Sequence, residues 1–275
     1  RYQIRGIQTG DFGVGTDPAV GVYVDGIYAA RSGASMTAFN DIERIEVLKG
    51  PQGTLFGRNS AAGAIAIITH QPTNEFDAMA RVRFGEFNKQ YFEGMLNAPL
   101  GDKLALRVNG VFNKSDGWMQ DAATGKDLAP EENWAGKVAL KWNLSENTNA
   151  TLSWDHDNLD QLARPAIGVV GNTAPFNYPS DPATYADPRK APIYNDVVGN
   201  EESRKLDQVN LFVDHSFGDL DFRSSTSYRK FETVNLEDED GTNQISVYFD
   251  TGNFEENKSI YQEFKLSGQN ERIDW

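Results

Sequence analysis

The sequence predicts a mainly β protein, and specifically a transmembrane antiparallel β-barrel of amphipathic strands. Beyond residue 78, apolar and polar residues alternate in about eight segments, most of them about ten residues long. That is the length a tilted strand needs to cross a bilayer. No apolar run approaches the ~18 residues of a membrane-spanning helix. The mean hydropathy of −0.55 fits a barrel, because half of each strand faces a wet lumen.

Composition excludes several classes of function. The chain has 275 residues with 26 Lys+Arg and 40 Asp+Glu, a formal net charge of −14 that argues against a nucleic-acid partner. It has no cysteine, which excludes disulfides, Cys-ligated zinc and thiol nucleophiles. The three histidines (His70, His156 and His215) are widely separated and give no zinc pair. No Gly-x-Ser-x-Gly elbow or phosphate-loop spacing is present, so we expect neither an enzyme nor a cofactor.

Two parts of different character follow one another. The first part, residues 1–71, is rich in glycine and has buried-strand patterns at 20–24, 45–48 and 65–68. A short helix is expected over 35–43. The sequence then predicts a linker over 72–77 and a strand domain over 78–275, which ends as a further strand begins.

In the strand domain the apolar period is two. Strands are predicted at 79–86, 90–98, 103–113, 133–144, 149–157, 203–217, 219–231 and 257–268. Val108 and Val138 lie on apolar faces, whereas Arg107, Asn109 and Lys137 lie on the opposite faces.

The connections between these strands alternate in length. Tight turns are predicted at 101–102, 145–147, 218–219 and 269–271, and long loops at 114–132, 158–202 and 231–256. Successive antiparallel connections lie at opposite ends of a sheet, so the tight turns share one end and the long loops the other. This asymmetry is typical of outer-membrane barrels. Trp142 and Trp154, beside the turn at 145–147, fit an aromatic girdle.

Two motifs carry a family resemblance. The sequence VYVDGIY at 22–28, followed by DIERIEVLKGPQGTLFGRNSAAGAIAIIT at 41–69, closely resembles the plug domain of TonB-dependent outer-membrane receptors. The resemblance implies that residues 1–71 are the C-terminal part of a mixed α/β plug inside the lumen. It also implies that the rest is the first eight to nine strands of a barrel with 22 strands in the intact family. Both ends cut through strand-like sequence, so we expect a fragment.

The resemblance also implies a function. Such a protein is an active transporter in the outer membrane of a Gram-negative bacterium, with outer-membrane lipid around it. It binds a scarce nutrient outside, most often a ferric siderophore or other iron complex, and imports it to the periplasm. Energy comes from TonB, with ExbB and ExbD, through a TonB box expected to precede Arg1.

Specific residues follow from the same resemblance. Arg5 and Lys49 match basic positions that lock the plug to barrel carboxylates, which we expect on strands beyond this chain. Many relatives have Arg where Lys49 stands, and Lys cannot make the bidentate fork. The expected ligand contacts lie in apical plug loops, with ordinary loop packing as their alternative: Phe12, Tyr28, Arg31, Ser32, Met36 and Asn59.

Other functions remain as alternatives. A passive porin-like barrel needs no plug, so the first 71 residues argue against it. A receptor of the same fold for oligosaccharide, haem or cobalamin stays open, because these receptors share the plug motifs. A soluble carbohydrate-active enzyme needs a carboxylate pair on a rigid site, whereas the acidic residues cluster in loops. Two acidic clusters, Asp155 to Asp160 and Glu237 to Asp240, are either solvated loops or calcium ligands.

Overall fold

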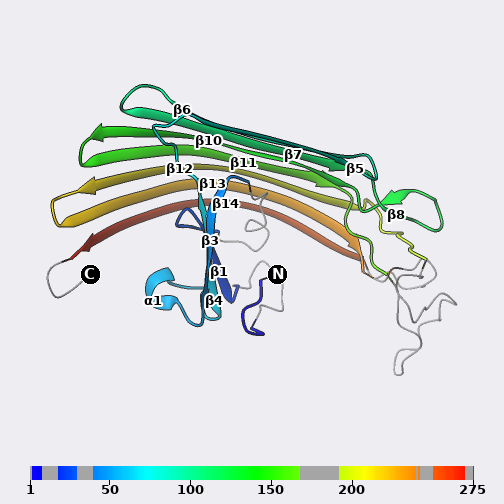
Figure 1. Cartoon of the computed structure of the whole chain (residues 1–275). Helices are drawn as coiled ribbons and strands as arrows, with labels where there is room; N and C mark the ends of the chain where they lie inside the picture. Colours follow the sequence, from blue (N-terminus) through cyan, green and yellow to red (C-terminus); the bar gives the residue numbers. More distant parts are fainter. Residues whose placement is uncertain are drawn as a thin grey trace.

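The computed structural model describes residues 2–7, 18–29, 40–167, 192–239, 241, 250–269 and 275. A four-stranded and an eight-stranded sheet make up most of it (Figure 1). The small sheet has the strand order β2-β1-β4-β3. Its elements are β1 (Val20–Val24), β2 (Ile27–Tyr28), β3 (Ile42–Lys49), the four-residue helix α1 (Gly53–Phe56) and β4 (Gly63–Thr69). The large sheet, called the wall below, arches over one end of the small sheet.

The small sheet mixes parallel and antiparallel pairing. β1 runs parallel to β4, while β3 pairs with β4 in the antiparallel sense. The turn from β1 to β2 is Asp25-Gly26, and both residues have positive φ, 51° and 85°. An Asp-Gly pair tolerates this conformation well, which is why it is frequent in tight hairpins. Val22 and Ile67 form part of the buried core beneath these strands.

The helix expected over 35–43 is wrong in its described part. Ile42 and Glu43 belong to β3, and Asn40 and Asp41 precede that strand without helical structure. Ile42 pairs with Thr69 at the start of the β3–β4 ladder, so the end of this segment belongs to the sheet, whereas an isolated short helix is only marginally stable. The helix that does form, α1, comes after β3, at Gly53–Phe56.

The wall is an antiparallel sheet in the order β14-β13-β12-β11-β10-β7-β6-β5. Its strands are β5 (Asp77–Gly85), β6 (Lys89–Pro99), β7 (Leu104–Ser115), β10 (Glu131–Ser145), β11 (Thr148–Gln161), β12 (Glu201–Ser216), β13 (Leu220–Asp238) and β14 (Asp250–Gly268). All eight predicted strands are therefore present. The sheet is open, with β5 and β14 at its two edges. Two long loops are shorter than predicted, because β13 and β14 stay paired as far as Asp238 and Asp250, and β11 extends to Gln161.

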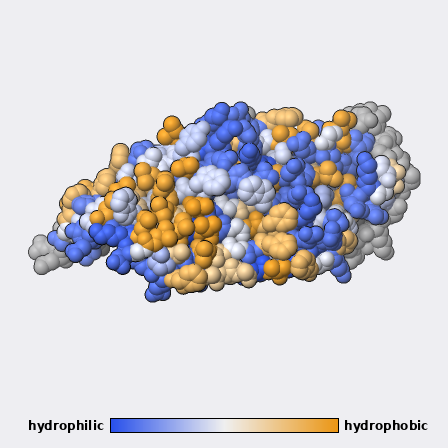
Figure 2. Space-filling model, turned by 90° about the horizontal axis from the view of Figure 1, so that it is seen from above, coloured by the Kyte–Doolittle hydropathy of each residue, from blue (hydrophilic) through white to orange (hydrophobic). Residues whose placement is uncertain are grey.

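The two faces of the wall differ in chemistry. Large apolar side chains are exposed on its convex face, among them Trp134, Val138, Trp142, Leu152, Trp154, Val209, Ile260 and Phe264. Figure 2 looks down on this face and shows apolar side chains gathered in patches across it. The concave face carries buried polar side chains, including Arg107, Lys137, Ser153, Gln208, Asn210 and Arg229. Within the described ranges, no helix has both the length and the apolar character to cross a membrane.

Asp121 joins two of the predicted long loops. It follows β8 (Met119–Gln120), which pairs with β9 (Asp127–Leu128). One carboxylate oxygen of Asp121 accepts hydrogen bonds from the backbone N–H of Ala123 at 3.0 Å and of Thr124 at 2.6 Å. The other oxygen accepts one from the backbone N–H of Asn195 at 2.8 Å. Burial alone raises the pKa of Asp121, but a hydrogen bond from the Thr124 hydroxyl at 2.8 Å and these backbone bonds outweigh it and hold the pKa below its ordinary value.

We expect Asp121→Ala to release the second loop from the first. A carboxylate with a lowered pKa stabilises the folded state above its ordinary pKa of 3.8, and this stabilisation is lost as pH falls through the lowered value. Loss of these hydrogen bonds should destabilise the contact between the two loops by about 1–3 kcal/mol. Hydrogen exchange at the Asn195 amide measures this loss. We expect faster exchange in the variant at neutral pH, and faster exchange in the wild type only in strong acid. Asp127→Ala in the same hairpin is the control, and equal exchange in both variants would contradict the role of Asp121.

Candidate interface between the small sheet and the wall

A buried ion pair joins the segment before β3 to strand β7. Arg107 donates from Nε to Asp41 Oδ2 and from Nη2 to Asp41 Oδ1, both at 2.6 Å. The two side chains are each 7% exposed. Asn109 donates a further bond to Asp41 at 3.0 Å, and Asn40 donates to Asn109 at 2.6 Å. The bidentate geometry and the extra donor satisfy the carboxylate, as a buried charge requires.

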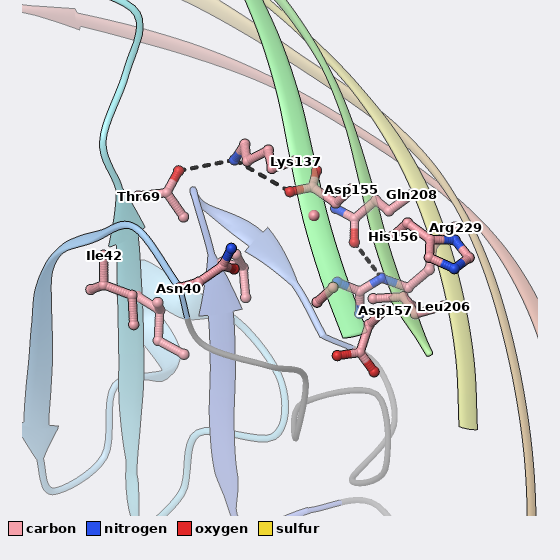
Figure 3. Close-up of a pocket in the computed structure, with 14 residues that line it drawn as sticks. Asn40, Ile42, Thr69, Lys137, Asp155, His156, Asp157, Leu206, Gln208 and Arg229 are labelled. Atoms are coloured by element: carbon pink, nitrogen blue, oxygen red, sulfur yellow. Dashed lines mark hydrogen bonds and ion pairs between the residues drawn. The ribbon is translucent and has the colours of Figure 1, made fainter. Parts of the chain in front are cut away.

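A second buried pair joins the β1–β2 turn to strand β10. Lys137 Nζ donates to Asp25 Oδ2 at 2.7 Å and to Thr69 Oγ1 at 2.9 Å, and Figure 3 shows the contact with Thr69. Asp25 also accepts bonds from the backbone N–H and the hydroxyl of Thr69, each at 2.8 Å. Asp155, on β11, lies 3.4 Å from the same ammonium group. Lys137 is thus shared between a carboxylate of the small sheet and one of the wall.

A chain of hydrogen bonds continues from Asp155 across the wall. Asn210 donates to Asp155 at 3.0 Å, Gln208 donates to Asn210 at 2.6 Å, and Arg229 Nε donates to Gln208 at 2.6 Å. These side chains come from β11, β12 and β13, which are neighbours in the sheet. Lys137, Asp155, Gln208 and Arg229 line a small cavity of about 60 Å³ between the two sheets (Figure 3).

Two predicted ligand contacts lie together beside α1. Asn59 donates a hydrogen bond to the hydroxyl of Tyr28 at 2.7 Å. Tyr23 packs against Tyr28 and Phe56, with ring centroids 5.3 and 4.7 Å away. Burial, followed by the nearby Tyr28, raises the pKa of Tyr23 to about 12. In Figure 1, α1 lies on the side of the small sheet nearer to the tight turns of the wall. The other four predicted contacts (Phe12, Arg31, Ser32 and Met36) lie outside the described residues.

The predicted lock residues are placed apart from these ion pairs. Arg5 lies in the turn between Ile4 and Ile7, and Lys49 ends β3 opposite Gly63. Both are exposed, and neither forms an ion pair with another described residue. Their pairing with carboxylates beyond the chain stays a prediction.

Sequence reasoning missed the residues that do join the two sheets. Alternation along the strands assigned Arg107 and Lys137 to the polar face, which is a usable signal. Asp25 and Asp41 lie outside the strands, in a turn and just before β3, where alternation gives no signal. The charges also have the opposite arrangement from the predicted lock, because the small sheet supplies the acids and the wall supplies the bases. Among the described side chains, no three His, Asp or Glu residues are grouped as for a metal ion.

Comparison with protein families gives one match. Residues 1–64 match the model of the family described as "TonB-dependent Receptor Plug Domain". This stretch includes β1, β3 and α1, together with Asp25 and Asp41.

Curated relatives extend the similarity into the wall. The chain is 32% identical to the catecholate siderophore receptor Fiu of Escherichia coli K12 over 166 residues, which are 58% of this chain and 20% of Fiu. It is 34% identical to the pesticin receptor of Yersinia pestis over 116 residues, or 40% of this chain and 16% of that receptor. The matched region is thus a fifth or less of the length of these relatives.

The solved structures share the fold. The crystal structure of the ferric yersiniabactin uptake receptor FyuA from Yersinia pestis superposes with a TM-score of 0.75 at 20% sequence identity. The superposition covers 94% of this chain and 38% of FyuA. Both sheets therefore fall within the shared fold.

Proposed function

We propose that this chain, whose residues 1–64 match a TonB-dependent receptor plug domain and whose fold is shared with FyuA, is part of an outer-membrane transporter. It binds an iron complex, most often a ferric siderophore, outside a Gram-negative cell and imports it to the periplasm. The names of Fiu and of the Pseudomonas aeruginosa ferric enterobactin receptor PirA, which is 30% identical over 122 residues, support an iron complex as cargo.

The buried ion pairs between the two sheets carry this proposal. A passive pore has no use for a domain fastened inside it, whereas a gated transporter needs a plug that holds firmly and can be released. Charged, hydrogen-bonded contacts such as Asp41–Arg107 and Asp25–Lys137 meet that need. Their strength depends on geometry, so a small displacement of the plug weakens them sharply.

The proposed domain division is a plug at 1–71, a linker at 72–77 and barrel strands at 78–275. A linker anchored to the wall supports it. Fully buried Asn97, on β6, donates to the carbonyl oxygens of Thr73 and Glu75, and accepts a bond from the Thr73 backbone N–H at 3.1 Å. In the proposed whole protein, further strands close the wall into a lipid-embedded barrel of 22 strands.

The proposed partners are the cargo, the surrounding outer-membrane lipid, and TonB with ExbB and ExbD. TonB acts through a TonB box in a segment preceding this sequence. The proposed cargo contacts remain Phe12, Tyr28, Arg31, Ser32, Met36 and Asn59. Arg5 and Lys49 are proposed to pair with carboxylates on strands outside this sequence.

Uptake of radioactive iron tests the function. Cells that make the full-length protein are compared with a deletion strain and with a strain lacking TonB, using a panel of ferric chelates. We expect one chelate to accumulate only when both the protein and TonB are present, and transcription to rise under iron limitation. Equal accumulation without TonB would indicate a passive pore. If only haem, cobalamin or an oligosaccharide were taken up in a TonB-dependent way, the proposed cargo would be wrong but the proposed active transport would stand.

A cross-link between the two sheets is expected to abolish uptake while leaving surface binding intact. Asn40 and Asn109 are joined by a 2.6 Å hydrogen bond, and the chain has no cysteine, so Asn40→Cys/Asn109→Cys offers a single pair for a short thiol-specific linker. We expect uptake to fall to background after cross-linking, and to recover when a reducible linker is cleaved. Asn109→Cys alone, treated in the same way, is the control. Normal uptake by fully cross-linked protein would show that β7 and the plug need not separate.

A further inference from the structure

The cavity between plug and wall contains an unsatisfied cationic donor. Arg229, on β13, is 4% exposed and uses its Nε to bind Gln208. Its Nη1 is buried and has no hydrogen-bond partner in the described part of the chain. A buried charged donor without an acceptor destabilises the folded state, so an unpaired N–H at this position suggests a function. An anionic oxygen entering the cavity would satisfy it.

The charges around the cavity balance only while the plug is in place. The wall contributes two cations, Lys137 and Arg229, and one carboxylate without a cation of its own, Asp155. Asp157 also lines the cavity, but it pairs with Arg204 at 2.9 Å. The plug contributes Asp25, which pairs with Lys137 and brings the sum of these four charges to zero. Removal of Asp25 therefore leaves the wall side of the cavity with an excess positive charge.

The contacts of Asp25 show that it leaves together with the plug. Two hydrogen bonds bind it to Thr69 of β4, in the same small sheet. Lys137 thus loses its carboxylate and its hydroxyl partner in one displacement. Asp155 and Arg229, by contrast, are held by Asn210 and Gln208 of the wall itself. The two cations stay in place and face the space that the plug has left.

We propose that Lys137 and Arg229 form a transit site for an anionic oxygen of the transported iron complex, and that Asp25 occupies this site in the resting protein. The proposal rests on the proposed function and defines its cargo as a chelate of net negative charge. Arg107, further along the wall, becomes a third available cation once Asp41 has left. A neutral complex gains nothing from either position.

Uptake by the full-length receptor in cells tests the transit site with two radioactive probes, an anionic ferric tris-catecholate and a neutral ferric trihydroxamate. Loss of a charge-assisted hydrogen bond predicts that Arg229→Gln slows accumulation of the anionic complex about tenfold. Binding of that complex to de-energised cells stays unchanged. Arg229→Lys keeps most of the rate because it keeps the charge. Arg223→Gln removes an exposed arginine from the same face of β13 and serves as the matched control.

Each other outcome overturns the transit site. Normal uptake of the anionic complex by Arg229→Gln does so, as does a wild type that transports only the neutral complex. If Arg229→Gln and Arg229→Lys lose uptake equally, Arg229 has a structural role. The same conclusion follows if the variants are missing from the outer membrane. A wild type that accumulates no ferric chelate refutes the proposed function itself, and that result needs no Arg229 variant.

Discussion

Replacing Arg107 with methionine is expected to loosen the plug from the wall. The substitution leaves the Asp41 carboxylate buried at 7% exposure, with hydrogen bonds from Asn109 but without its cation. Removing one partner of a buried pair costs about 3–5 kcal/mol, because the remaining charge is uncompensated. We expect faster proteolysis of residues 41–69 in the folded receptor, and entry of a large antibiotic that the intact plug excludes.

The matched control removes both charges. In Asp41→Asn/Arg107→Met no uncompensated carboxylate remains, so this double variant should be more stable than Arg107→Met alone. The difference, taken through a double-mutant cycle, gives the interaction energy of the pair. A double variant as unstable as the sum of the two single variants would mean that the pair contributes no coupling across the interface.

Replacing Lys137 with methionine is expected to have an effect of similar size, but one that depends on pH. Asp25 and Asp155 both lie against the Lys137 ammonium group, at 2.7 and 3.4 Å. Without it, two buried carboxylates face one another, a cost on the order of 3–5 kcal/mol at neutral pH. Acid weakens a repulsion between two carboxylates, so the loss should shrink as pH is lowered.

Hydrogen exchange at the Thr69 amide measures this loss, because that N–H donates to Asp25. We expect rapid exchange in Lys137→Met at neutral pH and partial recovery of protection in acid. Lys141→Met, on the same strand and the same face, is the control and should leave exchange unchanged at every pH. Loss of protection by the same factor at all pH values would instead indicate a packing defect rather than carboxylate repulsion.

The wall could be predicted from sequence because its determinants are local. Alternation with a period of two identified all eight strands, and it assigned Arg107 and Lys137 to the face that the structure places against the plug. Strand ends were less accurate. β13 and β14 continue to Asp238 and Asp250, where alternation fades, because backbone pairing does not need apolar side chains.

The partners across the interface could not be predicted in the same way. Asp25 lies 112 positions from Lys137, and Asp41 lies 66 positions from Arg107. Alternation defines on which face of the wall a side chain lies, but not where the small sheet rests against that face or which residues then meet. The Asp-Gly pair is fully accounted for by the local turn, so the sequence gives no sign that Asp25 also pairs with Lys137. The expected helix at 35–43 failed in its described part because pairing of β3 with β4 overrode local propensity.

The Asn97 contact has a consequence for how the proposed transporter resets after each cycle. Asn97 fastens the linker at the carboxyl end of the plug segment to β6, through the backbone of Thr73 and Glu75. Traction applied from the amino end would therefore unravel the segment progressively from that end while its last residues stay tethered. The extended polypeptide keeps a high effective concentration at its own binding surface. Refolding of the plug against the wall is then unimolecular, and it starts from the linker residues that Asn97 already holds in place.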